Sequence, residues 1–161
     1  MPKTLMLMRH GQYTSGTTCL NDVGKEQADD VATQLAAAKV IPDVIVHSET
    51  PRAIETAKRV RDVFNSVCGK VITLCPRPGL SVECETSSLA DITDVIDNAA
   101  QTILVVSHQP NITKILTGMY GKAAALSPNH AQIYVLQDNT PEWSAFHGRV
   151  VAQCGPKTLS R

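Results

Sequence analysis

Short apolar runs alternate along the chain with longer segments in which apolar residues recur every three or four positions. The apolar runs predict strands at residues 3–8, 43–46, 71–74, 102–106, 133–136 and 143–146. The periodic segments predict helices at residues 22–38, 51–66, 87–98 and 110–119. Apolar strands separated by amphipathic helices indicate an α/β fold, a three-layer α/β/α sandwich around a mostly parallel central sheet.

Length, charge and cysteine content narrow the class of protein. A chain of 161 residues fits a single domain spanning residues 1–161. Lys plus Arg and Asp plus Glu both number 15, a balance that argues against a nucleic-acid partner. No apolar stretch approaches the roughly 20 residues of a membrane span, so we expect no membrane association. Five cysteines without a CxxC pair favour neither a disulfide framework nor a zinc site, and they fit a reducing, cytoplasmic location.

Polar residues with catalytic potential follow three of the predicted strands. His10, His47 and His108 each lie at the carboxyl end of a strand, where parallel sheets bind their ligands. The tripeptide Arg9-His10-Gly11 suits attack on a phosphoryl group. An imidazole nitrogen can act as the nucleophile, a guanidinium can bind phosphate oxygens in pairs, and a glycine allows close backbone approach.

Two further residues can complete a phosphate pocket. Arg52 begins a helix soon after the second strand and could pair with Arg9, although a solvated helix arginine is the alternative. His108 could donate to a phosphoryl oxygen, and Pro110 predicts a first helical turn whose free N–H groups favour an anion. His47 fits an orienting or core role. No role is assigned to two other histidines, His130 and His147.

Four segments in order resemble the histidine phosphatase superfamily, the phosphoglycerate-mutase-like proteins. They are Leu7-Met8-Arg9-His10-Gly11, Leu20 to Ala28, His47-Ser48 through Arg52 to Ala57, and Val106-Ser107-His108. The resemblance implies a phosphoglycerate-mutase-like fold in which His10 is the phosphorylated nucleophile and the catalytic pocket also contains Arg9, Arg52 and His108. For substrate binding we expect the same three residues together with Gly11, Gln12, Asn21 and Gln109.

The short chain, without a long insert, resembles the SixA-type phosphohistidine phosphatases. Arg9-His10-Gly11-Gln12-Tyr13 also resembles the mitochondrial Ser/Thr protein phosphatase branch. Phosphohistidine on a phosphoprotein is therefore the favoured substrate. A phosphoserine or phosphothreonine protein and a small phosphate ester are the alternatives. A non-catalytic module that binds phosphoproteins is a rival from another class.

The proton donor for the leaving group is not fixed by the motifs. Glu83 and Glu85 lie in the loop after the third predicted strand, at the edge where His10 and His108 are expected to converge. Glu83 is the leading candidate and Glu85 the second, while exposed loop carboxylates without a role are the alternative. The sequence contains no evident metal-ligand cluster, so we expect neither a metal nor a cofactor. It leaves the oligomeric state open.

Overall fold

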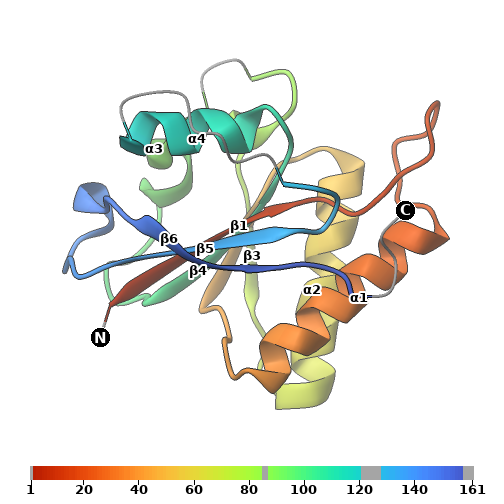
Figure 1. Cartoon of the computed structure of the whole chain (residues 1–161), viewed down its shortest axis with the longest axis horizontal. Coiled ribbons are helices and arrows are strands. Elements are labelled where there is room, and N and C mark those ends of the chain that lie inside the picture. The colour runs from red at the N-terminus through yellow and green to blue at the C-terminus, as the bar shows by residue number, and fades with distance from the viewer. Residues whose placement is uncertain (1, 85–86, 121–127, 158–161) are drawn as a thin grey trace.

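The computed structural model describes residues 2–84, 87–120 and 128–157. Its six strands form one sheet in the order β3-β2-β4-β1-β5-β6 (Figure 1). The strands are β1 (Lys3–Arg9), β2 (Val44–His47), β3 (Thr73–Pro76), β4 (Thr102–Ser107), β5 (Ile133–Asp138) and β6 (Arg149–Cys154). The helices are α1 (Asp22–Ala37), α2 (Pro51–Cys68), α3 (Leu89–Thr93) and α4 (Asn111–Tyr120). The predicted α/β class is confirmed.

The pairing of the strands places three strand ends beside one another. Strand β4 runs parallel to both β1 and β2, with Arg9 opposite Ser107 and His47 opposite Val106. β3 continues the parallel part of the sheet, whereas β5 is antiparallel to β1 and β6 is antiparallel to β5. The sheet is therefore mixed, and its parallel part brings the residues after β1, β2 and β4 to one edge.

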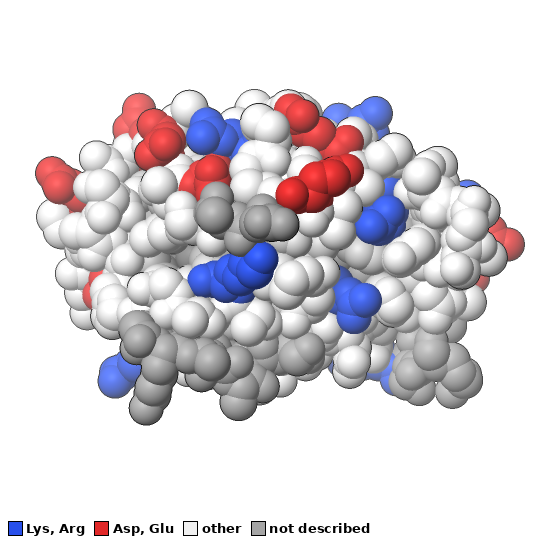
Figure 2. Space-filling model, turned by 90° about the horizontal axis from the view of Figure 1, so that it is seen from above, with Lys and Arg blue, Asp and Glu red and all other residues white. Residues whose placement is uncertain are grey.

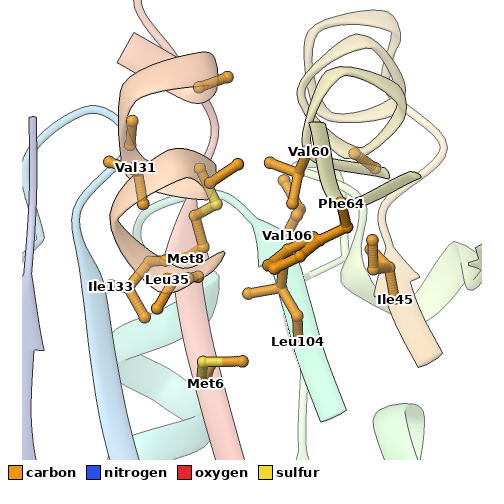
Figure 3. Packing of buried hydrophobic residues seen from close by; sticks show 14 of the residues in the cluster. Met6, Met8, Val31, Leu35, Ile45, Val60, Phe64, Leu104, Val106 and Ile133 are labelled. Atoms are coloured by element: carbon orange, nitrogen blue, oxygen red, sulfur yellow. The ribbon is translucent and has the colours of Figure 1, made fainter. Parts of the chain in front are cut away.

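Successive side chains of the buried strands point to opposite faces of the sheet and so contribute to two separate hydrophobic cores. Met6 and Met8 of β1 point to the face covered by α1 and α2, while Leu5 and Leu7 point to the opposite face. In the first core, Val60 and Phe64 of α2 and Val31 and Leu35 of α1 lie over the sheet residues Met6, Met8, Ile45, Leu104, Val106 and Ile133 (Figure 3). Each fully buried apolar side chain of this kind stabilises the folded state by about 1.5–3 kcal/mol relative to an exposed one.

The second core lies between the sheet and the segments α3, α4 and the turn at residues 143–145. At the amino end of β1, the buried Lys3 donates from Nζ to the carbonyl oxygens of Asn98 and Ala100, at 2.6 and 3.1 Å. The same nitrogen lies 5.0 Å from the centre of the Trp143 ring. A buried ammonium group is tolerated here because acceptors and an aromatic face replace its water.

Two predicted elements were wrong. The segment 143–146 is a 3-10 turn, Trp143–Ala145, whose buried tryptophan donates from Nε1 to the Ala100 oxygen at 2.9 Å. The last strand is instead β6, an edge strand whose largely exposed residues carry little apolar pattern. The helix predicted at 87–98 is only α3, because Asp97 caps a following turn by accepting from the Ala99 N–H at 2.8 Å.

Charges of both signs are distributed over the face that carries α3 and α4 (Figure 2). Acidic side chains gather toward one margin of this view, and basic side chains lie among neutral ones. This mixture agrees with the formal net charge of zero. None of the described helices combines the length and the apolar character needed to cross a membrane.

Candidate active site

His10 directly follows β1 and is buried, with 3% of its surface exposed. Its Nδ1 lies 2.7 Å from the carbonyl oxygen of Gly11. A carbonyl can only accept, so Nδ1 carries the proton and Nε2 keeps its lone pair. Arg52 donates from Nε to that Nε2 at 3.3 Å. The Gly11 carbonyl thus selects the tautomer of His10, and the Arg52 guanidinium lies at its unprotonated Nε2.

Close contact between two glycines holds the Gly11 turn in place. A Cβ on Gly11 would lie 2.6 Å from the Gly24 oxygen, and a Cβ on Gly24 would lie 2.0 Å from the Gln12 oxygen. The turn therefore rests directly on the first turn of α1. On its other side, the Gly11 N–H donates to Thr56 Oγ1 at 3.1 Å, and that hydroxyl donates to the Arg52 oxygen at 2.8 Å.

Arg9 and Arg52 both bring positive charge close to His10. The Arg52 guanidinium lies 4.4 Å from the centre of the Tyr13 ring, a cation–π contact that restricts its position. Arg9 donates from Nη1 to the Pro128 oxygen at 3.3 Å, while its buried Nε has no partner among the described residues. Burial and the nearby Arg52 lower the pKa of Arg9, whereas Tyr13 opposes this change. An anion would relieve this uncompensated charge.

His108 lies beside His10, with 5.0 Å between the two ring centres. Its Nε2 is 2.7 Å from Ser48 Oγ, and Ser48 Oγ accepts from the Thr50 N–H at 3.2 Å. Because that N–H already occupies one acceptor position, the serine hydroxyl is free to donate to Nε2. Nδ1 would then carry the proton, and it is buried without a partner among the described residues. The Nδ1–H of His108 is therefore a donor that the described protein atoms leave unused.

Both imidazoles are neutral at pH 7. Burial lowers the pKa of His10 to about 3, assisted by repulsion from His108, Arg52 and Arg9 and opposed by its bond to Gly11. Burial and the same two arginines lower the pKa of His108 to about 4. A neutral His10 has an available lone pair for attack on phosphorus.

Several predicted substrate contacts are engaged within the protein. Asn21 Nδ2 donates to Gln12 Oε1 at 3.1 Å, and Asn21 Oδ1 accepts from the Gly24 N–H at 2.8 Å as the cap of α1. Gln109 Nε2 donates to Thr113 Oγ1 at 2.8 Å. These bonds place Gln12, Asn21 and Gln109 in the framework around the pocket, and their contact with substrate stays a prediction.

The expected anion site at the start of α4 was wrong. The N–H groups of Ile112, Thr113 and Lys114 donate to the His108 oxygen, Gln109 Oε1 and the Pro110 oxygen, respectively. These amides are satisfied within the turn and are not free for a phosphate. The helix also begins at Asn111, one residue after the predicted start.

The structure leaves the proton donor unassigned. Glu83 is exposed, and no hydrogen bond or ion pair joins it to the pocket in the part of the chain that the structure describes. Glu85 lies outside the described residues. Within the described ranges, no group of three or more His, Cys, Asp or Glu side chains could hold a metal ion. Glu83 as donor remains a prediction.

Sequence reasoning missed two rings that lie beside His10. The ring centres of Tyr13 and His130 lie 5.4 and 5.7 Å from that of His10, and 6.4 Å from each other. Neither residue lies at a strand end or in a helical pattern, so periodicity gave no signal. By contrast, His47 is buried with Nδ1 2.8 Å from the Ser48 oxygen, as an orienting or core residue would be.

The chain thus combines a phosphoglycerate-mutase-like α/β fold with a cluster of two histidines and two arginines at one edge of the sheet. Residues 5–75 match the sequence profile described as histidine phosphatase superfamily (branch 1), which confirms the resemblance found in the motifs. No curated protein matches the sequence.

Solved structures with the same fold cover almost the whole chain. The protein histidine phosphatase SixA in complex with tungstate has 20% identity and a TM-score of 0.76, over 95% of this chain and 97% of its own. SixA from Agrobacterium tumefaciens, a candidate phosphohistidine phosphatase, has 20% identity and a TM-score of 0.73 over 98% and 99%. Phosphoserine phosphatase from Entamoeba histolytica, in complex with 3-phosphoglyceric acid, has 16% identity and a TM-score of 0.65 over 98% of both. Together with the profile match over residues 5–75, these structures show the phosphoglycerate-mutase-like fold.

Proposed function

We propose that this protein is a phosphatase that removes phosphate from a phosphoprotein, with phosphohistidine as the favoured substrate, through a covalent phosphohistidine intermediate on His10. The observation that carries this proposal is the state of the His10 ring. Its Nδ1 is held by the Gly11 oxygen, and its Nε2 faces the Arg52 guanidinium at 3.3 Å. A neutral imidazole with its lone pair on Nε2 is the form of histidine that can attack phosphorus.

The reaction takes place in two displacements. His10 Nε2 attacks phosphorus, and the bond to the leaving group breaks with its electron pair. Water then attacks the phosphohistidine and returns the electron pair to Nε2. Arg9, Arg52 and His108 bind the phosphoryl oxygens, so catalysis rests on positioning and electrostatic stabilisation. The chemistry uses side chains alone, and we propose that it needs neither a metal nor a cofactor.

The leaving group supports the preference for phosphohistidine. An alkoxide leaving from phosphoserine or phosphothreonine needs a proton from a nearby acid. An imidazole leaves more readily, since its own pKa is about 6.5. Among the described residues, no hydrogen bond or ion pair joins a carboxylate to the His10 ring, and the sequence-based donor Glu83 is exposed. The alternative substrates are phosphoserine or phosphothreonine proteins and small phosphate esters that bind at the same site.

The test is covalent labelling. Brief incubation with a protein carrying radiolabelled phosphohistidine should leave an acid-labile, base-stable label on the wild-type protein. His10→Ala should abolish the label and the turnover. His147→Ala is the matched control, because His147 is exposed and its N–H is bonded to Asp138 at the opposite edge of the sheet.

Two results would contradict the proposal. Label that persists in His10→Ala would place the intermediate elsewhere. Tight binding of phosphoproteins without labelling or hydrolysis would favour the non-catalytic binding module. A parallel panel of phosphohistidine, phosphoserine and phosphothreonine peptides and small phosphate esters would identify the substrate class.

A further inference from the structure

We propose that His130 is the residue that transfers a proton to the leaving group at this site. Such a proton transfer would allow the enzyme to hydrolyse phosphate esters as well as phosphohistidine. This inference rests on the proposed function, because it assigns a role in the same reaction. It offers an imidazole from the residues before β5 in place of the exposed loop carboxylate that the sequence suggested.

The segment that carries His130 is fastened to the backbone of the catalytic residues. The Ala131 N–H lies 3.0 Å from both the Arg9 and the His10 oxygens. The Arg9 N–H donates to the Gln132 oxygen at 3.2 Å, and Arg9 Nη1 donates to the Pro128 oxygen at 3.3 Å. Four contacts over five residues therefore fix this segment against Arg9 and His10.

A strained backbone supports the same conclusion. Ala131 has a φ of 60°, in the left-handed region that an alanine rarely adopts. Such a conformation costs of order 1 kcal/mol and tends to be kept where function needs it. Here it directs the Ala131 N–H onto the two carbonyls and leaves the adjacent His130 ring 5.7 Å from the His10 ring.

The surroundings of His130 suit proton transfer. The ring is partly exposed, so protons can exchange with solvent. The rings of His10 and Tyr13 and the charge of Arg9 face it. Burial and Arg9 lower the pKa of His130 in the free pocket. A bound phosphoryl dianion opposes the field of Arg9 and favours the imidazolium form.

The proton balance closes over the two steps. As the N–P bond forms on His10 and the P–O bond breaks, the His130 imidazolium gives its proton to the leaving oxygen. In the second step water attacks phosphorus and its proton passes to solvent, while the partly exposed His130 regains a proton from solvent. The P–N electron pair returns to His10 Nε2, and inorganic phosphate leaves with His130 again protonated.

The experiment compares leaving groups of graded acidity. Wild type, His130→Gln, Glu83→Gln and the control His147→Gln are assayed with p-nitrophenyl phosphate, phenyl phosphate and an alkyl phosphate. We expect His130→Gln to slow the alkyl ester by about 100-fold, the typical effect of losing a general acid. The p-nitrophenyl ester, whose leaving group needs little protonation, should slow by less than about fivefold. The covalent label from phosphohistidine should persist.

A pH profile provides a second measurement. The wild-type rate with the alkyl ester should fall as the pH rises, because the imidazolium is the reactive form. In His130→Gln the profile should be flatter. His130→Asn, monitored by thermal unfolding, provides a second variant if the first does not fold.

Each remaining outcome overturns the assignment. Equal slowing of every substrate in the His130 variants would indicate a structural role. Selective loss of the alkyl ester in Glu83→Gln instead would return the role to the loop carboxylate. Hydrolysis of phosphohistidine but of no ester, or a steep leaving-group dependence already in the wild type, would show that no acid assists. Absence of any label on His10 would contradict the proposed function itself.

Discussion

Substitution of Gly24 by alanine tests whether the contact between α1 and the Gly11 turn positions the nucleophile. The new Cβ would lie 2.0 Å from the Gln12 oxygen, whereas real Cβ contacts essentially never fall below 3.0 Å. The obstacle is backbone on both sides, so either the turn or the helix must move by about 1 Å.

The expected loss follows from two opposing contributions. Overpacking of this kind costs about 3 kcal/mol, and alanine in a helix regains about 1 kcal/mol over glycine. The net loss of about 2 kcal/mol lowers the Tm of a domain of this size by roughly 4–8 °C. Turnover should fall by more than the loss of stability alone would cause, because the displaced segment also carries the Gly11 oxygen that orients His10.

Gly118 offers a matched control on another helix. It is an exposed glycine of α4, and a Cβ there would meet nothing within 4 Å. Gly118→Ala should therefore raise stability by about 0.5–1 kcal/mol and leave the rate unchanged. Thermal unfolding and turnover of both variants would be measured together. A Gly24→Ala variant that is as stable and as active as Gly118→Ala would refute the reasoning.

Four further experiments test the proposed site. Arg52→Ala should lower turnover about 100- to 1,000-fold by removing a charge-assisted contact in the transition state. Vanadate should inhibit the enzyme and EDTA should not. Activity that is lost in EDTA and restored by a divalent ion would contradict the metal-free mechanism. Thr56→Val leaves the Gly11 N–H without its acceptor and should cost about 1–3 kcal/mol of stability in urea unfolding; an unchanged midpoint would argue against that bond. Because the folded-state pKa values of His10 and His108 lie below the unfolded value of 6.5, the unfolded chain gains protons first as the pH falls. Each of these two histidines should lower the free energy of unfolding by about 2 kcal/mol at pH 5. The substitution His10→Asn should therefore reduce the difference in unfolding free energy between pH 7 and pH 5. An unchanged difference in that variant would contradict a neutral, buried His10.

The parts predicted from the sequence are those that local patterns encode. His10 and His108 could be placed because each follows an apolar run whose strand end is defined by the chain itself. Arg52 could be placed because it begins a helix close to such an end. The strand β6 could not, since an exposed edge strand has little hydrophobic alternation. The apolar run at 143–146 predicts a strand, but Trp143 is buried in a 3-10 turn through tertiary contacts with Lys3 and Ala100. The local pattern does not reveal these contacts.

The neighbours of the nucleophile were hidden for a different reason. Tyr13 lies on an isolated bridge to Leu20 and His130 in a turn before β5, and contacts with residues distant in sequence place both beside His10. The bond from Ala131 to the Arg9 and His10 oxygens spans more than a hundred residues and involves no distinctive side chain. A single sequence carries no local sign of such a contact.

The bond from His10 Nδ1 to the Gly11 oxygen has a consequence for how this pocket can change. Because the acceptor belongs to the main chain, no substitution of a neighbouring side chain removes it, provided the turn keeps its path. A carboxylate in that place would add a charge that pulls a proton onto the ring, whereas a carbonyl orients the imidazole without doing so. Side chains around the rim can therefore be exchanged to alter the substrate while the reactive nitrogen keeps its state. Redesign of specificity should begin at the rim and leave the Gly11–Gly24 contact untouched.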